Sequence, residues 1–174
     1  SGPIDGVRCV PSVRDLPERV DLLVVAAASE GIPQLLRETI DSGKANSLIL
    51  IPGGMGETEG SRDLQTELRE IIAASRQTAD GGPILLGGNC LGVRSRPGRY
   101  DTFFVPSDKL DPRRGEACSP TALITQSGGF VITQMSNLES VNPALAITIG
   151  NQLDLTVADL LSEVGRRDDI EVIG

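Results

Sequence analysis

The sequence contains no histidine and no tryptophan among its 174 residues, and aromatic residues make up only 2% of it. Without histidine, the chain itself cannot hold a Ser–His or Cys–His catalytic pair, a histidine-ligated metal or a phosphohistidine. Its three cysteines are an odd number and lack the spacing of a metal site. We therefore expect no metal site, and the cysteine usage indicates a reduced, cytoplasmic protein.

Other absences narrow the class of protein further. No apolar run reaches the roughly 20 residues that a membrane helix needs, and the chain does not open on a signal-peptide layout. The 24 acidic and 16 basic side chains give a net charge of −8, which argues against nucleic acid as a partner. A hydrophobic content of 39% is enough for a packed core.

Short apolar runs alternate with stripes of helical spacing. The runs are typical of strands that are buried on both faces of a parallel sheet, and they span residues 22–28, 48–51, 84–86, 122–124, 144–149 and 170–173. The helical stripes cover about 32–40, 64–75 and 157–164, with Gly43 suited to a C-terminal cap and Ser61 to an N-terminal cap. Thr156 and Asp159 have the spacing of a capping box. This repetition predicts an α/β fold with parallel sheets and flanking helices.

The middle of the chain interrupts this pattern. Residues 94–120 hold four prolines and five arginines without a clean period. We therefore predict a first unit over 1–93, a linker or ordered excursion over 94–114, and a second unit over 115–174. Both units have few strands, so we expect a segment of a longer protein with open sheet edges and uncovered apolar faces.

Glycine concentrates in the turns that follow the strands, where parallel sheets place their ligand sites. Residues 52–57 follow the second run, residues 87–92 the third, and Ser127, Gly128 and Gly129 the fourth. Ser127 leads into an expected helix over 130–138, whose first amides could hold an anion such as phosphate. The alternative is that glycine is simply common in strand–helix turns.

Asn89 and Cys90 stand in the unusual string Gly-Asn-Cys-Leu-Gly at residues 88–92. An asparagine between glycines can fix a loop through its own backbone bonds. Cys90 could be a thiolate nucleophile whose pKa a helix N-terminus lowers, but no histidine is present to activate it. The favoured interpretation is a small, buried and inert cysteine.

Charged residues near these turns have two interpretations each. The acids at the start of the second helix are favoured as partners of its dipole over a catalytic role: Glu57, Glu59 and Asp63. The arginines after the Asn-Cys turn could clamp phosphates, or they could be solvated or paired with nearby acids: Arg94, Arg96 and Arg99. For the arginines, the sequence leaves both interpretations open.

The strings at these turns resemble the CoA-ligase superfamily, which includes the succinyl-CoA synthetase α subunit and, more closely, the NDP-forming acyl-CoA synthetases. Residues 16–26 look like a strand of the family's Rossmann-like CoA-binding domain. Residues 52–57 are similar to its next turn, and Gly-Gly-Asn-Cys-Leu-Gly at 87–92 resembles the string that closes that domain. Residues 126–129 and 149–154 look like the start of the flavodoxin-like ligase domain.

The resemblance implies a reversible reaction in which acyl-CoA, NDP and phosphate give acid, CoA and NTP through an acyl phosphate and a phosphohistidine. It implies that Pro52, Gly53 and Gly54 lie along CoA, with Asn89 and Cys90 near the thiol end. It also implies that Ser127, Gly128 and Gly129 begin a helix that faces the phosphoryl group. The implied ligands are CoA and acyl-CoA or acyl phosphate, with ATP or GTP and Mg²⁺ only in the complete enzyme. The implied partner is an ATP-grasp domain or subunit, and a homo-oligomer is left open.

Departures from the family pattern keep other functions in view. Gly88 replaces a proline, and the family's first glycine-rich CoA turn, its ligase histidine and its nucleotide-binding domain are not found in these residues. We therefore expect the chain to be inactive alone, whether or not it belongs to an enzyme. The alternative is a non-catalytic CoA- or acyl-CoA-binding regulatory module. A third interpretation is a structural subunit whose unfinished sheets a partner covers.

Overall fold

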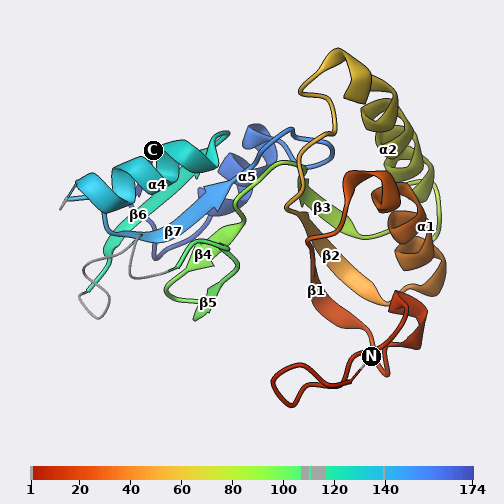
Figure 1. Ribbon diagram of the computed structural model, residues 1–174. Helices are drawn as coiled ribbons and strands as arrows, with labels where there is room; N and C mark the ends of the chain where they lie inside the picture. The colour runs from red at the N-terminus through yellow and green to blue at the C-terminus, as the bar shows by residue number, and fades with distance from the viewer. Residues whose placement is uncertain (1, 107–109, 111–116, 139) are drawn as a thin grey trace.

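The computed structural model describes residues 2–106, 110, 117–138 and 140–174, and it contains two sheets. The first sheet consists of β1 (Val20–Val25), β2 (Ala45–Leu50) and β3 (Ile84–Gly87), all parallel and in that order. The connections are α1 (Ile32–Ser42) and α2 (Arg62–Ser75), and both lie on the same face of the sheet (Figure 1). Three short 3₁₀ turns accompany them: η1 (Val13–Asp15), η2 (Ser29–Gly31) and η3 (Glu59–Ser61).

Strand alternation distributes the apolar side chains of the first sheet between two cores. Leu48 and Leu50 face α1 and α2, where they pack in one buried cluster with Leu36 and Leu68. Ile49 points the other way and packs with residues of the second sheet. Since successive side chains of a strand point to opposite faces, a fully apolar strand such as β2 serves both cores.

The second sheet has the order β5-β4-β7-β6-β8. Its parallel strands are β6 (Ser119–Thr125), β7 (Pro143–Thr148) and β8 (Val172–Ile173). The helices α4 (Gly128–Asn137) and α5 (Val157–Val164) pack on opposite faces, because Val131 and Val164 belong to different buried clusters. The expected α/β class with flanking helices is confirmed.

Two short strands of this sheet lie at the start of the expected linker or ordered excursion. β4 (Val93–Ser95) pairs antiparallel with β7, and β5 (Tyr100–Asp101) pairs antiparallel with β4. Residues 94–101 are therefore strands and the turn between them. The rest of the expected linker, residues 102–114, falls partly outside the described residues. The sheet is thus mixed, because β4 and β5 form a hairpin on the edge of β7.

Helix ends follow the sequence signals closely. Gly43 ends α1 with φ of 60°, a left-handed value that glycine adopts without strain. Thr156 and Asp159 form the capping box at the start of α5. Ser61 lies at the N-cap position of α2, but its hydroxyl makes no cap bond to that helix. It accepts instead from the amides of Gly56 and Thr58, so it fixes the preceding turn.

The loop after β7 joins the two sheets. The amides of Leu153 and Leu155 donate to the carbonyls of Gly87 and Leu85, at 2.9 and 3.1 Å. The carboxylate of Asp154 accepts from the Leu85 amide at 2.9 Å and pairs with Arg76. The loop therefore covers the β3 edge, and Leu153 is buried in the core of the first sheet.

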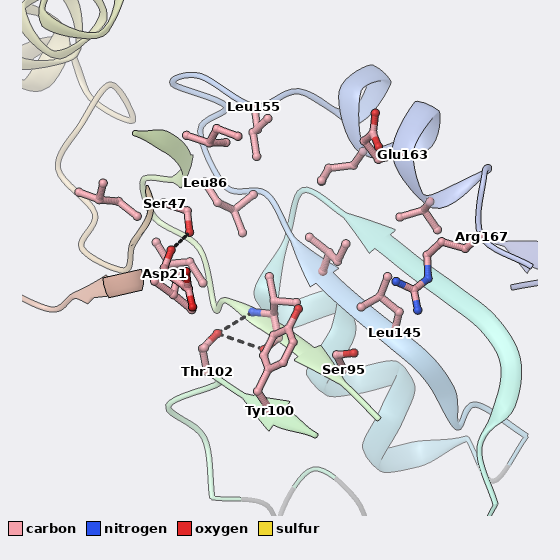
Figure 2. A pocket seen from close by; sticks show the side chains of 18 residues that line it. Asp21, Ser47, Leu86, Ser95, Tyr100, Thr102, Leu145, Leu155, Glu163 and Arg167 are labelled. Atoms are coloured by element: carbon pink, nitrogen blue, oxygen red, sulfur yellow. Dashed lines mark hydrogen bonds between the residues drawn. The ribbon is translucent and has the colours of Figure 1, made fainter. Parts of the chain in front are cut away.

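A groove of about 780 Å³ lies between the helix-free face of the first sheet and the second sheet with α5 (Figure 2). Its walls are mostly apolar and include Leu86, Leu145 and Leu155, with Glu163 and Arg167 at the α5 side. On the helix-free face, Leu22 is 37% exposed and Ile84 is 52% exposed. This apolar face is thus partly exposed around Leu22 and Ile84, while Ile49 on the same face packs against the second sheet. Within the described residues, no helix is long and apolar enough to cross a membrane.

Candidate functional site at the carboxyl ends of the two sheets

The turns that follow β2, β3, β6 and β7 lie in contact with one another. The Asn89 amide donates to the Pro52 carbonyl at 2.8 Å, and the Asn151 amide donates to the Gly88 carbonyl at 2.8 Å. The Gly150 amide donates to the Gln126 carbonyl at 3.1 Å. Hydrogen bonds therefore link turns from both sheets into one surface, where the sequence analysis expected ligands.

Gly53 and Gly54 are both exposed in the turn after β2. Gly54 has φ of +83°, and a Cβ there would lie 3.1 Å from the Ser29 hydroxyl oxygen. This contact brings the turn after β1 to the same surface. A Cβ on Gly53 would lie 3.4 Å from the nearer Glu57 oxygen and 3.5 Å from the Asn89 side-chain oxygen, which are ordinary contacts. The turn thus offers bare backbone between two polar side chains.

Asn89 and Cys90 point in opposite directions. Asn89 is exposed and adopts φ of 52°, a left-handed value that asparagine tolerates better than most residues. Cys90 is 3% exposed, and its thiol donates to the Leu50 carbonyl at 3.3 Å. Burial raises the pKa of Cys90 to about 12, so the thiol stays protonated at neutral pH. This geometry agrees with an inert buried cysteine.

Close packing of backbone holds Asn89 in place. A Cβ on Gly150 would collide with the Gly88 carbonyl oxygen, so only glycine allows this approach. Below the turn, the buried Thr148 hydroxyl accepts from the amides of Leu91 and Gly92, at 2.7 and 2.9 Å. One side chain thus satisfies two buried donors that the turn would otherwise leave without partners.

The helix α4 begins at the same surface. Ser127 is its N-cap and accepts from the Phe130 amide at 3.4 Å. A Cβ on Gly128 would lie 3.0 Å from the Leu91 Cβ, so the start of the helix contacts the Asn-Cys turn. A Cβ on Gly129 would meet only the Ser127 hydroxyl, at 3.7 Å. Ser127 and Gly129 are exposed, and a helix start of this kind favours negative charge.

Glu57 does not have the role that the sequence favoured, which was to interact with the dipole of α2. Its carboxylate accepts from the Met55 amide at 2.7 Å and from the Asn151 side-chain amide at 2.8 Å. Partial burial acts to raise the pKa of Glu57, but these hydrogen bonds outweigh it and keep the pKa below its usual value. Asp63 does lie in the first turn of α2, and Glu59 lies in the first turn of η3.

The arginines after the Asn-Cys turn are engaged in the second sheet. The Arg94 guanidinium pairs with Asp101 at 3.1 Å, and Arg94 is buried. Arg96 donates to the Asn142 side-chain oxygen at 3.3 Å. Of the two interpretations, the structure favours pairing within the protein for these two residues. Arg99 is exposed and adopts φ of 55°.

Three contributors to this surface were not given a role from the sequence: Ser29, Thr148 and Asn151. Each acts through a contact with a residue that is distant in the chain. Ser29 and Asn151 stand in turns directly after strands, and that position was the one available signal. No group of three or more potential metal-ligating side chains occurs within the described parts of the chain.

This fold is found in a known class of protein. The chain belongs to the family of the CoA binding domain, whose model matches residues 1–96. The model of the succinyl-CoA ligase like flavodoxin domain matches residues 118–174. The resemblance to the CoA-ligase superfamily is thus confirmed. The two matched ranges correspond to the two sheets, with two exceptions: β4 lies in the first range but in the second sheet, and β5 lies between the ranges.

Among individual proteins, the chain is similar to the α subunit of ADP-forming acetate–CoA ligase I from Pyrococcus furiosus. The two are 31% identical over 152 residues, which are 86% of this chain and 30% of the relative. The ADP-forming acetate–CoA ligase of Methanocaldococcus jannaschii is 26% identical over 98% of this chain and 22% of its own length. The chain therefore spans about a third or less of these relatives.

A solved structure agrees with the sequence relatives. The dinucleotide forming acetyl-coenzyme A synthetase 1 of Ca. Korarchaeum cryptofilum, in its apo form, superposes with a TM-score of 0.81 at 26% identity. The match covers 99% of this chain and 35% of that one. The same synthetase in complex with phosphate and ADP gives a TM-score of 0.80.

Proposed function

We propose that this chain supplies the CoA-contacting and phosphoryl-facing turns of an NDP-forming acyl-CoA synthetase. The observation that carries the proposal is the contact between turns of both matched units at one surface, described above. In the proposed reaction, acyl-CoA, NDP and phosphate give acid, CoA and NTP. The reaction passes through an acyl phosphate and a phosphohistidine, and the histidine lies outside this chain.

In this proposal, CoA lies along Pro52, Gly53 and Gly54, with its thiol end near Asn89 and Cys90. The exposed backbone of Gly53 supports such a contact, because Gly53 itself has no side chain and its nearest neighbours there are the polar side chains of Glu57 and Asn89. The chain has net charge −8, so binding of a polyanion depends on backbone amides and helix starts more than on lysine.

The phosphoryl group is proposed to face Ser127, Gly128 and Gly129. The first amides of α4 and its dipole can stabilise a migrating phosphoryl group without a change in protonation state. In the complete enzyme, an ATP-grasp domain or subunit would supply ATP or GTP with Mg²⁺. The chain alone is proposed to turn over no substrate, because the nucleotide site and the phosphorylated histidine belong to that larger assembly.

Calorimetric titration of CoA into the chain tests the binding half of the proposal. The matched variant is Gly53→Ala, whose new methyl group meets only ordinary contacts in the fold. We expect the wild-type chain to bind CoA and the variant to bind at least about tenfold more weakly with an unchanged melting temperature. Equal affinity of the two proteins would remove Gly53 from the CoA site.

A non-catalytic CoA- or acyl-CoA-binding regulatory module remains the second candidate, and the lack of histidine in the chain favours it. The parent protein decides between the two functions. A synthetase forms a thioester from acid, CoA and NTP, and takes up label from radioactive NTP. A regulatory module binds CoA without either reaction.

A further inference from the structure

Glu57 and Asn151 form a direct side-chain contact between the two units. The Asn151 side-chain amide donates to the Glu57 carboxylate at 2.8 Å and to the Met55 carbonyl at 3.0 Å. The second oxygen of Glu57 accepts from the Met55 amide at 2.7 Å. Both polar groups of the Met55 backbone are thus bonded to this pair of side chains.

The same pair is bonded to the turn after β3. The Asn151 backbone amide donates to the Gly88 carbonyl at 2.8 Å. Asn151 therefore contacts the turn at 52–57 through its side chain and the turn at 87–92 through its backbone. The side chains of Glu57 and Asn89, one from each turn, both lie beside Gly53. The contacts of Asn151 thus add a second link between these two turns, beside the direct bond from the Asn89 amide to the Pro52 carbonyl.

We propose that Glu57 and Asn151 are a positioning pair that holds the turn at 52–57 against the turn at 87–92, in the arrangement that CoA binds. This inference rests on the proposed function. Neither residue is required to contact CoA. The pair acts by fixing exposed, glycine-rich backbone before the ligand arrives, which reduces the entropy lost on binding.

The electrostatics of the pair favour this role. Partial burial acts to raise the pKa of Glu57, but its hydrogen bonds lower it further and so favour the carboxylate, and a charged acceptor makes stronger hydrogen bonds than a neutral one. Replacement of the Asn151 amide by a carboxylate would place two negative groups in contact. It would also set an oxygen against the Met55 carbonyl. The arrangement thus requires a donor at position 151 and an acceptor at position 57.

The test uses variants that exchange these two roles. Asn151→Asp removes the donor. Asn151→Asp combined with Glu57→Gln restores one hydrogen bond, because the new glutamine amide donates to the new aspartate while its oxygen still accepts from Met55. The double variant has the same net charge as the wild type. Glu59→Gln is the control for charge at an exposed acid in the same segment.

Calorimetric titration with CoA provides the first readout. We expect Asn151→Asp to bind CoA about tenfold more weakly, which corresponds to the loss of one hydrogen bond to a charged group. The double variant is expected to recover part of that loss, and Glu59→Gln is expected to bind as the wild type does. Wild-type affinity in Asn151→Asp, or no recovery in the double variant, would overturn the proposal.

Hydrogen exchange without CoA provides a second readout that does not depend on the proposed function. Backbone amides of the peptide covering 52–57 should exchange faster in Asn151→Asp and slow again in the double variant. If the wild type binds no CoA but exchange follows this order, the proposed function fails and the positioning pair stands. If exchange is equal in all variants, the pair fails even where the wild type binds CoA.

Discussion

Removal of the Leu153 side chain should destabilise the first sheet, although Leu153 lies in the loop that follows β7 of the second. Leu153 is 5% exposed and packs in the cluster that contains Leu48, Leu50 and Leu85. Truncation of a buried leucine to alanine costs about 2–5 kcal/mol, and we expect Leu153→Ala to cost about 3 kcal/mol. For a chain of this size, that loss lowers the melting temperature by about 6–12 °C.

Two probes in one urea titration check this expectation. Far-ultraviolet circular dichroism reports both sheets, and the fluorescence of the single tyrosine, Tyr100 on β5, reports the second sheet. We expect both probes to shift together in Leu153→Ala, because the loop makes the two units one cooperative structure. The control is Leu161→Ala, in which a side chain that is 43% exposed is truncated at a cost of about 1 kcal/mol. The coupling of the two sheets would be refuted if both variants lost the same free energy of unfolding, or if the urea midpoint shifted for one probe alone.

Four further predictions concern the turns. Gly129→Ala should raise stability by about 0.5 kcal/mol, because alanine is the better helix former, and should weaken phosphate binding; thermal denaturation and phosphate titration measure the two effects. In the native chain at pH 8, a thiol reagent should modify the other two cysteines and spare Cys90, which should react only after unfolding. The raised pKa of Cys90 also predicts stability that is present below pH 9 and decreases as pH rises toward 12, which denaturation of the wild type and Cys90→Ala at several pH values would detect. Thr148→Val should cost about 2–4 kcal/mol in urea denaturation, since it leaves the amides of Leu91 and Gly92 without their acceptor.

Each of these predictions has a result that would contradict it. A less stable Gly129→Ala, or one that binds phosphate as tightly as the wild type, would remove the start of α4 from the phosphoryl site. Rapid modification of Cys90 in the folded chain would contradict its burial, as would an identical pH profile for Cys90→Ala. A loss below about 1 kcal/mol in Thr148→Val would mean that water replaces the hydroxyl.

The sequence predicted the elements that depend on local patterns. The apolar run at 48–51 gave β2, and the Thr156 and Asp159 spacing gave the start of α5. The positions of the turns followed, because a parallel sheet brings the carboxyl ends of its strands to one edge. Membership of the CoA-ligase superfamily was evident from the strings in those turns.

What the sequence did not predict depends on contacts between distant residues. β4 and β5 have three and two residues, which are too few to show the alternating pattern of a strand. Arg94 is buried in β4, but in the sequence its charge is typical of an exposed linker. Glu57 looked like a partner of the helix dipole because it precedes α2, yet its partner Asn151 lies 94 residues away. The path of the loop at 151–155 along β3 likewise depends on packing. Leu153 follows a strand of the second sheet but is buried in the core of the first sheet.

The location of CoA on the chain is the most direct test of the account. Nuclear magnetic resonance of the ¹⁵N-labelled chain, titrated with CoA, reports which backbone amides the ligand affects. We predict shifts at Gly53, Gly54 and Asn89 that saturate with CoA, with Ser127 and Gly129 responding to added phosphate. Shifts confined to the groove around Leu86 and Leu145, or no shifts at any CoA concentration, would contradict the assignment of these turns to the CoA site.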